Sequence, residues 1–345
     1  HNGEFNMTAL AMTMSDKRNA VSRKHEEVTR EMWPEFESSD RPITHVTNGV
    51  HTATWLAPEF DDLFHLTLPS DWRNFLTDEQ YWKQVYNIPD HLLWHVRQEL
   101  SRHLGRYIGD LLRKRTADDD NDLVVRGALY NPAALTLCFA RRFATYKRAD
   151  LIFHDPDRLA RILNDARHPV QLIYSGKAHP ADDGGKSMIK EIWEFAQDPM
   201  FRGKVLFIED YSMHTAKTLV QGADVWLNLP RAPLEASGTS GMKAGMNGVP
   251  NLSVLDGWWM ESYNGRNGWA ITSNEHLDKK EQDDMDAEQL YRLIENEVVP
   301  LYYNRDLDNI PKAWLQVVKE SMATVMPKFC SERMMKEYVG KLYLP

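Results

Sequence analysis

A regular alternation of apolar runs and helical patterns, from residue 134 onward, constrains the fold of this chain more than any other feature. The apolar runs are short and nearly free of polar residues, as expected of strands buried on both faces of a parallel sheet. Five runs follow one another: "ALTLCFA", "VQLIYSG", "KVLFIED", "ADVWLNL" and "VPNLSVLD". Helices are expected between them at residues 145–165, 186–198 and 213–221. The pattern predicts an α/β fold with a Rossmann-like, doubly wound parallel sheet.

The remaining segments are predicted to be largely helical. Residues 5–33 carry spaced apolar positions without an internal proline, and residues 90–115 form a strongly amphipathic pattern with steps of three or four. Between them, "ITHVTNGVHTATW" is a short β-like run, interrupted at the turn pair Asn48-Gly49. The tail, residues 287–345, is predicted to form several helices.

An acidic segment, "TADDDNDLV", follows the amphipathic pattern, and its D-x-D-x-D spacing is similar to that of a calcium loop. Leu123 stands where the turn glycine of such a loop belongs, and Leu129 stands where the bidentate glutamate belongs. We therefore expect no calcium site. The 13 histidines are scattered without a close pair at metal-ligand spacing, so no other metal site is expected.

The length, the net charge and the cysteine content limit the classes of protein to which the chain can belong. A length of 345 residues allows about two domains, and a net charge of -9 argues against wholesale binding to nucleic acid or anionic lipid. Cys138 and Cys330 form no disulfide framework, which suits a reducing cytoplasm. No apolar stretch approaches the length of a membrane span, and no signal peptide is visible. Because the chain begins with His1 inside a helical pattern, we expect a fragment of a longer protein.

Unusual polar residues follow four of the predicted strands. Arg141, Arg142, Lys147 and Arg148 come after the first, Lys177 after the second, Asp210 and Tyr211 after the third, and Glu235 and Lys243 after the fourth. The carboxyl ends of parallel strands share one edge of the sheet, so we expect these loops to converge there. Four cations at the start of a solvated helix are an alternative, but helix starts favour acidic residues. The cations therefore favour a phosphate site.

The stretch "LEASGTSGMKAGMNG" after the fourth run is rich in small residues. Ser237, Gly238, Thr239, Ser240 and Gly241 would let the backbone approach a ligand closely and leave amide N–H groups free for an anion. The spacing is that of neither a P-loop nor a G-x-G-x-x-G motif. Lys243 could pair with a phosphate or form a Schiff base with an aldehyde cofactor. Glu235 could bind a sugar hydroxyl or cap the helix, and a plain loop is the alternative for the whole stretch.

"EASGTSGMKAGMNGVPNLSVLDG" resembles the pyridoxal-phosphate signature of the α-glucan phosphorylases, glycosyltransferase family 35. Further blocks resemble the family in the same order: "RKHEEV", "HVTNGVHTATWLAPE", "FARRFATYKRA", "SGKAHPADDGGK" and "FIEDY". The resemblance covers nearly the whole chain. It implies the C-terminal, Rossmann-like domain of a two-domain GT-B fold. Residues 1–50 would be the last part of the N-terminal domain, and residues 51–345 the cofactor-binding domain, with a helical lead-in at 51–125.

The resemblance also implies roles for individual residues. Lys243 is similar to the lysine that holds pyridoxal 5'-phosphate as a Schiff base, and Arg142 and Lys147 to the cations that bind the substrate phosphate. The cofactor would further contact Arg141, Thr239, Ser240, Gly241, Tyr211 and, with a less defined role, Lys177. The glucosyl unit would contact Glu235, Ser237, Gly238 and Asn48. Metal ligands are not implied.

The implied reaction is reversible phosphorolysis, in which a terminal α-1,4-linked glucose leaves a glucan as glucose 1-phosphate with retained configuration. The cofactor phosphate passes a proton to inorganic phosphate, and cations neutralise the two phosphates in contact. The implied partners are the α-1,4-glucan, inorganic phosphate, the missing N-terminal domain and a second subunit of a cytoplasmic homodimer. Nucleic acid and membrane are not expected as partners.

Some positions depart from the animal branch of the family. Ala144 replaces a histidine, and Trp258 and Trp259 replace smaller residues, which suggests a bacterial branch. The chain is also much shorter than complete members, so the fragment could be inactive alone. Two alternatives stay open: a nucleotide-sugar-dependent glycosyltransferase of the GT-B fold, and a non-catalytic carbohydrate-binding or assembly module. A nucleotide-sugar enzyme would have no need of Lys243. A non-catalytic module with a vestigial site would not be expected to retain Lys243, Arg142, Lys147 and Glu235 together.

Overall fold

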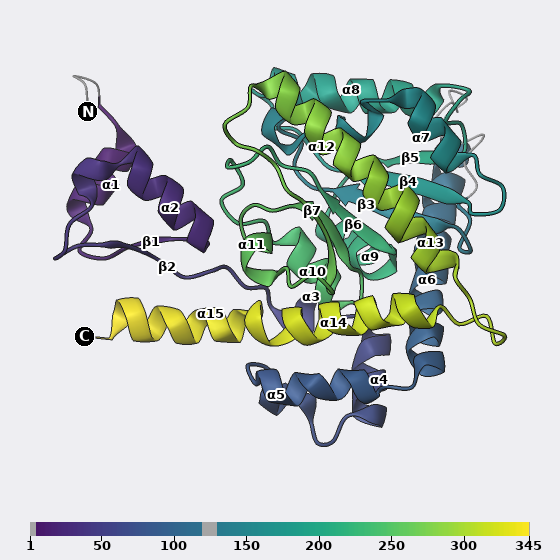
Figure 1. Ribbon diagram of the computed structural model, residues 1–345, viewed down its shortest axis with the longest axis horizontal. Helices are drawn as coiled ribbons and strands as arrows, with labels where there is room; N and C mark the ends of the chain where they lie inside the picture. Colours follow the sequence, from purple (N-terminus) through teal and green to yellow (C-terminus); the bar gives the residue numbers. More distant parts are fainter. Residues whose placement is uncertain (1–4, 119–129, 345) are drawn as a thin grey trace.

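The computed structural model describes residues 5–344 except residues 119–129, and its centre is a parallel sheet of six strands (Figure 1). In chain order the strands are β3 (Leu135–Ala140), β4 (Val170–Ser175), β5 (Val205–Ile208), β6 (Val225–Asn228), β7 (Asn251–Val254) and β8 (Gly268–Ile271). Their spatial order is β5-β4-β3-β6-β7-β8. The chain builds outward from β3 in one direction and then returns to add β6, β7 and β8 in the other. The predicted doubly wound parallel sheet is confirmed.

The strand order reverses between β3 and β6, where Leu137 pairs with Val225 and Cys138 with Trp226. Loops that leave the carboxyl ends of two such strands turn to opposite sides, and ligands of doubly wound sheets bind at this point. The loop after β3 begins with Arg141, and the loop after β6 leads to Glu235. The topology therefore brings the loop that carries Arg141 and the loop that carries Glu235 to one place.

The strands are buried as their apolar sequences predict. All six residues of β3 and all six residues of β4 are buried. The few polar side chains in them are hydrogen bonded: the Ser175 hydroxyl donates to the Ile208 carbonyl oxygen over 2.7 Å. The Gln171 amide donates to the Thr136 hydroxyl over 2.8 Å. These bonds replace the water that burial removes, so the polar residues fit the interior without a large desolvation cost.

Helices connect the strands. They are α7 (Pro156–Leu163), α8 (Asp183–Gln197), α9 (Met213–Gly222), α10 (Ser240–Met246) and the short α11 (Trp259–Ser262). Helix α12 (Lys279–Leu293) follows the last strand. Side chains cap the first turns of α7, α8 and α9, from Asp155, Asp182 and Ser212 respectively. Helix α9 packs against β3, α7 against β4, and α12 against β8.

A second set of helices surrounds this unit. It consists of α3 (Thr52–Trp55), α4 (Pro58–Thr67), α5 (Glu79–Trp82), α6 (Asp90–Asp118), α13 (Val299–Tyr303), α14 (Lys312–Lys328) and α15 (Ser331–Tyr338). Helix α6 packs against α9, and α14 packs against α10, α5 and α6. Figure 1 shows α14 and α15 running one after the other below the sheet, with α4 and α5 drawn beneath them. None of the described helices combines the length and the apolar character that crossing a membrane requires.

Residues 5–45 form a small lobe set apart from the sheet domain in Figure 1. It contains α1 (Met7–Met14), α2 (Arg23–Met32) and a parallel pair of strands, β1 (Arg18–Ala20) and β2 (Ile43–His45). The lobe contacts the sheet domain near the glycine-rich stretch. The Ser22 hydroxyl donates to the Ala236 carbonyl oxygen over 2.6 Å. Just after the lobe, the Thr47 hydroxyl donates to Glu261 over 2.8 Å.

Three sequence-based predictions of helices are corrected. Residues 5–33 are not one helix, because residues 18–20 pair with β2 as a strand. Residues 145–165 form two short 3₁₀ turns before α7, which begins only at Pro156, where proline suits the first helical position. The helical tail begins with α12 at Lys279, ahead of residue 287. The sixth strand, β8, was not predicted; it begins with Gly268, a residue type that is depleted in strands. The acidic segment with the calcium-like spacing lies largely outside the described residues.

Gly222, the last residue of α9, packs directly against α6. A Cβ atom at this position would lie 2.5 Å from the Cβ of Leu104 and 2.9 Å from the Leu100 carbonyl oxygen. We therefore expect Gly222→Ala to lower the free energy of unfolding by about 1–3 kcal/mol, because the two helices must move apart. Chemical denaturation measures this change.

Gly109 in α6 provides the control. A Cβ there would meet nothing closer than an arginine Nη1 at 4.0 Å. Gly109→Ala should be neutral or raise the free energy of unfolding by up to about 1 kcal/mol, because alanine favours the helix. Equal effects of the two substitutions would contradict the close packing of α6 and α9.

Candidate active site

The carboxylate of Glu235 lies between two cations. Its Oε2 is 2.7 Å from Nη2 of Arg141 and 2.9 Å from Nζ of Lys147. Only 8% of Arg141, 5% of Lys147 and 5% of Glu235 is exposed. Arg141 and Lys147 come from the loop after β3, and Glu235 comes from the loop after β6. The cluster therefore joins the two loops at the reversal of strand order, as the sequence predicts.

This cluster holds two positive charges against one negative charge. Burial favours the protonated form of Glu235, but Arg141 and Lys147 outweigh it and hold the pKa of Glu235 below its ordinary value. Glu235 is therefore ionised at neutral pH, and the cluster keeps a net positive charge. The Nε of Arg141 is buried without a hydrogen-bond partner among the described residues. An anion beside this guanidinium would neutralise the net positive charge of the cluster and accept a hydrogen bond from the unpaired N–H group.

Tyr211 lies beside the same guanidinium. Its hydroxyl donates to the Ala140 carbonyl oxygen over 3.5 Å, a long contact at the end of β3. Burial, with a smaller contribution from Cys138, raises the pKa of Tyr211 to about 12, although the charge of Arg141 acts in the opposite direction. Tyr211 is therefore a neutral hydrogen-bond donor at the edge of the cluster.

The backbone of Glu235 is fixed by a buried carboxyl group. Asp256 accepts the N–H of Glu235 over 2.9 Å and the N–H of Gly257 over 2.8 Å. Burial raises the pKa of Asp256 to about 7, against the effect of these two hydrogen bonds, and the charge of Glu235 adds to the rise. Asp256 thus ties the loop after β6 to the loop after β7.

The small residues of the glycine-rich stretch serve different purposes. Gly238 has a φ of 81°, a left-handed conformation that favours glycine. A Cβ on Gly241 would lie 2.3 Å from Oδ1 of Asn251, so close packing against β7 requires this glycine. The hydroxyl of Ser240 accepts a hydrogen bond from the Trp226 indole over 3.1 Å. The Ser237 hydroxyl is buried without a partner among the described residues, and Thr239 makes no side-chain cap of α10.

Lys243 lies on α10 and is half-buried. Its Nζ is 3.8 Å from the centre of the Trp55 ring, which belongs to α3. Burial lowers the pKa of Lys243 below its ordinary value. A larger fraction of this amine is therefore neutral and nucleophilic than in an exposed lysine. Trp55 was not predicted as a site residue, since its sequence neighbourhood gives no sign that it would meet α10.

The remaining predicted residues lie at different depths. Arg142 and Lys177 are exposed, and their loops run side by side, because Phe143 N–H donates to the Lys177 carbonyl oxygen over 3.0 Å. Asn48 is half-buried, and its backbone pairs with Val21 and Arg333. Within the described part of the chain, no hydrogen bond joins the Asn48 side chain to the Glu235 cluster.

Arg148, the fourth cation of the loop after β3, serves a structural purpose. Its guanidinium lies 2.7 Å from Asp286 and 2.8 Å from Asp283, and only 3% of the residue is exposed. It also donates to the Leu229 and Pro230 carbonyl oxygens. The expectation that all four cations face an anion is wrong in this respect, because one of them holds α12 against the loops.

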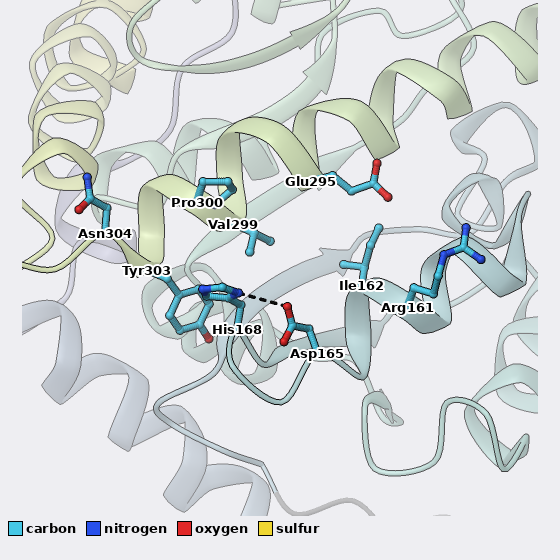
Figure 2. A pocket seen from close by; sticks show the side chains of 9 residues that line it. All are labelled: Arg161, Ile162, Asp165, His168, Glu295, Val299, Pro300, Tyr303 and Asn304. Atoms are coloured by element: carbon cyan, nitrogen blue, oxygen red, sulfur yellow. Dashed lines mark hydrogen bonds and ion pairs between the residues drawn. The ribbon is translucent and has the colours of Figure 1, made fainter.

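A separate cavity of about 530 Å³ lies between α7 and the segment that leads into α13. Figure 2 shows His168 and Asp165 paired on one wall, at 3.1 Å, with Tyr303 close to them. Arg161 and Asn304 lie at opposite ends of the view. None of the predicted site residues lines this cavity. Among the described residues, no group of three or more His, Cys, Asp or Glu side chains could hold a metal ion.

Comparison with known proteins agrees with this arrangement. The family model for carbohydrate phosphorylase matches residues 1–267, and the chain belongs to this family. Glycogen phosphorylase from Aquifex aeolicus is 44% identical over 343 residues, which are 98% of this chain and 49% of that protein. Maltodextrin phosphorylase from Thermococcus litoralis is 44% identical over 347 residues, or 99% of this chain and 41% of that protein.

Glycogen phosphorylase from Mycobacterium tuberculosis is 40% identical over 350 residues, which are 99% of this chain and 40% of that protein. The chain thus spans about half or less of the length of these relatives. The predicted resemblance to the α-glucan phosphorylases is confirmed at the level of the family.

The raised pKa of Asp256 predicts how its contribution to stability depends on pH. The folded protein binds a proton at this carboxyl group up to about pH 7. An unfolded aspartate has lost that proton above about pH 4. The contribution of Asp256 to the free energy of unfolding is therefore complete at low pH and falls as the pH rises to 7.

Denaturation of the natural protein and of Asp256→Asn between pH 5 and pH 8 tests this expectation. The free energy of unfolding of the natural protein, minus that of the variant, should decrease as the pH rises. A difference that stays constant across this range would contradict the assignment.

Proposed function

We propose that the protein of which this chain is a part is an α-1,4-glucan phosphorylase. It would release terminal glucosyl units as glucose 1-phosphate and use pyridoxal 5'-phosphate as cofactor. The observation that carries the proposal is the buried cluster of Arg141, Lys147 and Glu235 at the reversal of strand order. Glu235 lies in the loop that leads into α10, the helix that carries Lys243. The two loops and α10 thus offer candidate partners for a sugar (Glu235), for an anion (Arg141 and Lys147) and for an aldehyde (Lys243).

The residues fit the cofactor. Lys243 offers a half-buried amine whose pKa is lowered by burial, as covalent attachment of an aldehyde requires. The unpaired Nε of Arg141 and the unpaired hydroxyl of Ser237 are buried polar atoms that a bound ligand would satisfy. We infer that Lys243 holds the aldehyde end of pyridoxal phosphate, and that Arg141, Thr239 and Ser240 hold its phosphate. Tyr211, Gly241 and Lys177 would complete the surroundings.

Bound at Lys243, the cofactor would supply a phosphate group able to exchange a proton with inorganic phosphate. The residues of the protein would bind the substrates and neutralise the negative charge of the phosphates. Arg142 and Lys147 would hold inorganic phosphate, and their charges would lower the repulsion between two phosphates in contact. Glu235, Ser237, Gly238 and Asn48 would bind the hydroxyl groups of the glucosyl unit. Ionised Glu235 is suited to this, since a carboxylate accepts strong hydrogen bonds from hydroxyl groups.

The organisation of the whole protein is also proposed. Residues 1–50 would be the last part of an N-terminal domain, and residues 51–345 the cofactor-binding domain. The exposed apolar side chains of the lobe, Phe5, Met7 and Met14, agree with a larger neighbour in the complete protein. A cytoplasmic homodimer of the bacterial branch is the proposed form. A nucleotide-sugar-dependent glycosyltransferase remains the second candidate, since the fold and Glu235 would suit it equally.

The first test is covalent attachment of the cofactor. The full-length protein with pyridoxal phosphate should show an absorbance band that survives dialysis after borohydride reduction. Lys243→Ala should lose this band, because the amine is gone, whereas Lys190→Ala, an exposed lysine on α8, should keep it. A natural full-length protein without the band would exclude the pyridoxal-phosphate site and favour the nucleotide-sugar alternative.

The second test concerns Arg142, the exposed arginine next to Arg141 in the loop after β3. Arg142→Ala should raise the KM for inorganic phosphate roughly tenfold, since a charge-assisted hydrogen bond is lost, while the absorbance of bound cofactor is retained. Arg167→Ala is the matched control, because the Arg167 side chain is 85% exposed and lies away from the cluster. An unchanged KM in Arg142→Ala would remove Arg142 from the phosphate site.

A further inference from the structure

Asn247, the residue that ends α10, uses its whole side chain to join two elements of the site. It is fully buried, with an exposed fraction of 0%. Its Nδ2 donates to the Trp55 carbonyl oxygen over 2.9 Å and to the Lys243 carbonyl oxygen over 2.8 Å. Its Oδ1 accepts the N–H of Ala57 over 2.8 Å. One amide group therefore holds the backbone on both sides of the contact between Lys243 and Trp55.

The backbone of Asn247 is held in turn by a buried arginine of α6. Nη1 of Arg97 donates to the Asn247 carbonyl oxygen over 2.9 Å and to the Gln221 carbonyl oxygen over 2.6 Å. Its Nη2 donates to the Ala223 carbonyl oxygen, and only 2% of Arg97 is exposed. Asn247 is thus fixed relative to α6 and to the end of α9 before it makes its own contacts.

The backbone that follows Asn247 is held in one conformation by close packing. Gly248 has a φ of 65°, and a Cβ there would lie 2.9 Å from Cγ1 of Val318 in α14. The turn out of α10 is therefore closely packed. Since Asn247 stands between this turn and Lys243, a shift of its side chain would move the Lys243 backbone or the Trp55 backbone, rather than the surrounding core.

We propose that Asn247 is a positioning residue for Lys243, because it fixes the backbone of the lysine and that of Trp55 at one separation. The lysine amine is thereby kept 3.8 Å from the centre of the Trp55 ring and half-buried. Asn247 itself would touch neither substrate nor cofactor. The value of this position for attaching a cofactor rests on the proposed function, whereas the placement of the amine does not.

Asparagine suits this position because the site needs two donors and one acceptor in one neutral, compact group. Alanine would remove the Asn247 partner of the Lys243 carbonyl oxygen and of the buried Ala57 N–H group, while the Trp55 carbonyl oxygen would keep the Gln221 amide at 3.1 Å. Leucine would conserve most of the volume and make none of the three hydrogen bonds. Aspartate would keep the acceptor but add a charge close to Lys243, so it is not a clean test.

The test uses Asn247→Ala and Asn247→Leu in the full-length protein, with Asn267→Ala as the matched control. Asn267 is also fully buried, and its amide donates to the Ser262 carbonyl oxygen over 2.8 Å, without contact to Lys243. Thermal unfolding shows that each variant is folded and how far it is destabilised. Asn247→Leu serves if Asn247→Ala does not fold.

The first readout needs no bound cofactor. Competitive labelling of lysines with acetic anhydride at a series of pH values, on protein stripped of cofactor, gives the midpoint for Lys243 by peptide mass spectrometry. In both Asn247 variants the midpoint should rise by about half a pH unit or more, since a displaced amine becomes more exposed. In Asn267→Ala it should stay at the natural value even if stability falls. A natural midpoint in both Asn247 variants would overturn the proposal.

The second readout separates this inference from the proposed function. Pyridoxal phosphate is added, and the amount retained without reduction is compared with the amount trapped at Lys243 by borohydride. The Asn247 variants should trap roughly tenfold less while retaining a similar total, because attachment depends on the aim of the amine. If the natural protein traps none, the proposed function fails, and the labelling midpoints alone decide the role of Asn247. Equal trapping in natural and variant proteins would contradict the positioning role.

Discussion

The two ion pairs of Glu235 are the interaction on which the candidate site depends. A buried charge is tolerated only where partners compensate for lost hydration, and here one carboxylate compensates for Arg141 and Lys147 at once. The three residues come from two loops that the topology of the sheet sends to opposite sides. Their pairing therefore fixes both loops at the point where the strand order reverses, and Asp256 adds a third loop through the backbone of Glu235.

Much of the fold could be predicted from the sequence, because strands that are buried on both faces appear as short, mainly apolar runs. The five predicted strands are present, since "ALTLCFA" and its successors contain almost no polar residues. The strand Gly268–Ile271 was not predicted, because it begins with a glycine, which is depleted in strands, and leaves only three apolar residues. The continuous helix at residues 5–33 failed for a different reason: Arg18–Ala20 pairs with a strand more than 20 residues away, and local periodicity cannot report such a partner.

The candidate site was predictable where its residues directly follow the strands of the parallel sheet. The loops after parallel strands converge by topology, so Arg141, Lys147 and Glu235 could be placed together without coordinates. Arg148 could not be separated from them, because its partners Asp283 and Asp286 lie in a helix more than 130 residues later. Trp55 was missed for the same reason. Its contact with Lys243 depends on how the helical lead-in packs against α10, which neither spacing nor composition encodes.

The short length of α10 has a consequence for how the site responds to stress. A helix of seven residues has no appreciable stability in isolation, so α10 exists only through its packing against β6, α9 and α14. Lys243 therefore sits on an element that cannot melt separately and leave the domain intact. Amide hydrogens in this helix exchange with solvent only when a large cooperative unit opens. We therefore expect the Lys243 amine to keep its place for as long as the domain stays folded, in contrast to residues carried by a mobile lid.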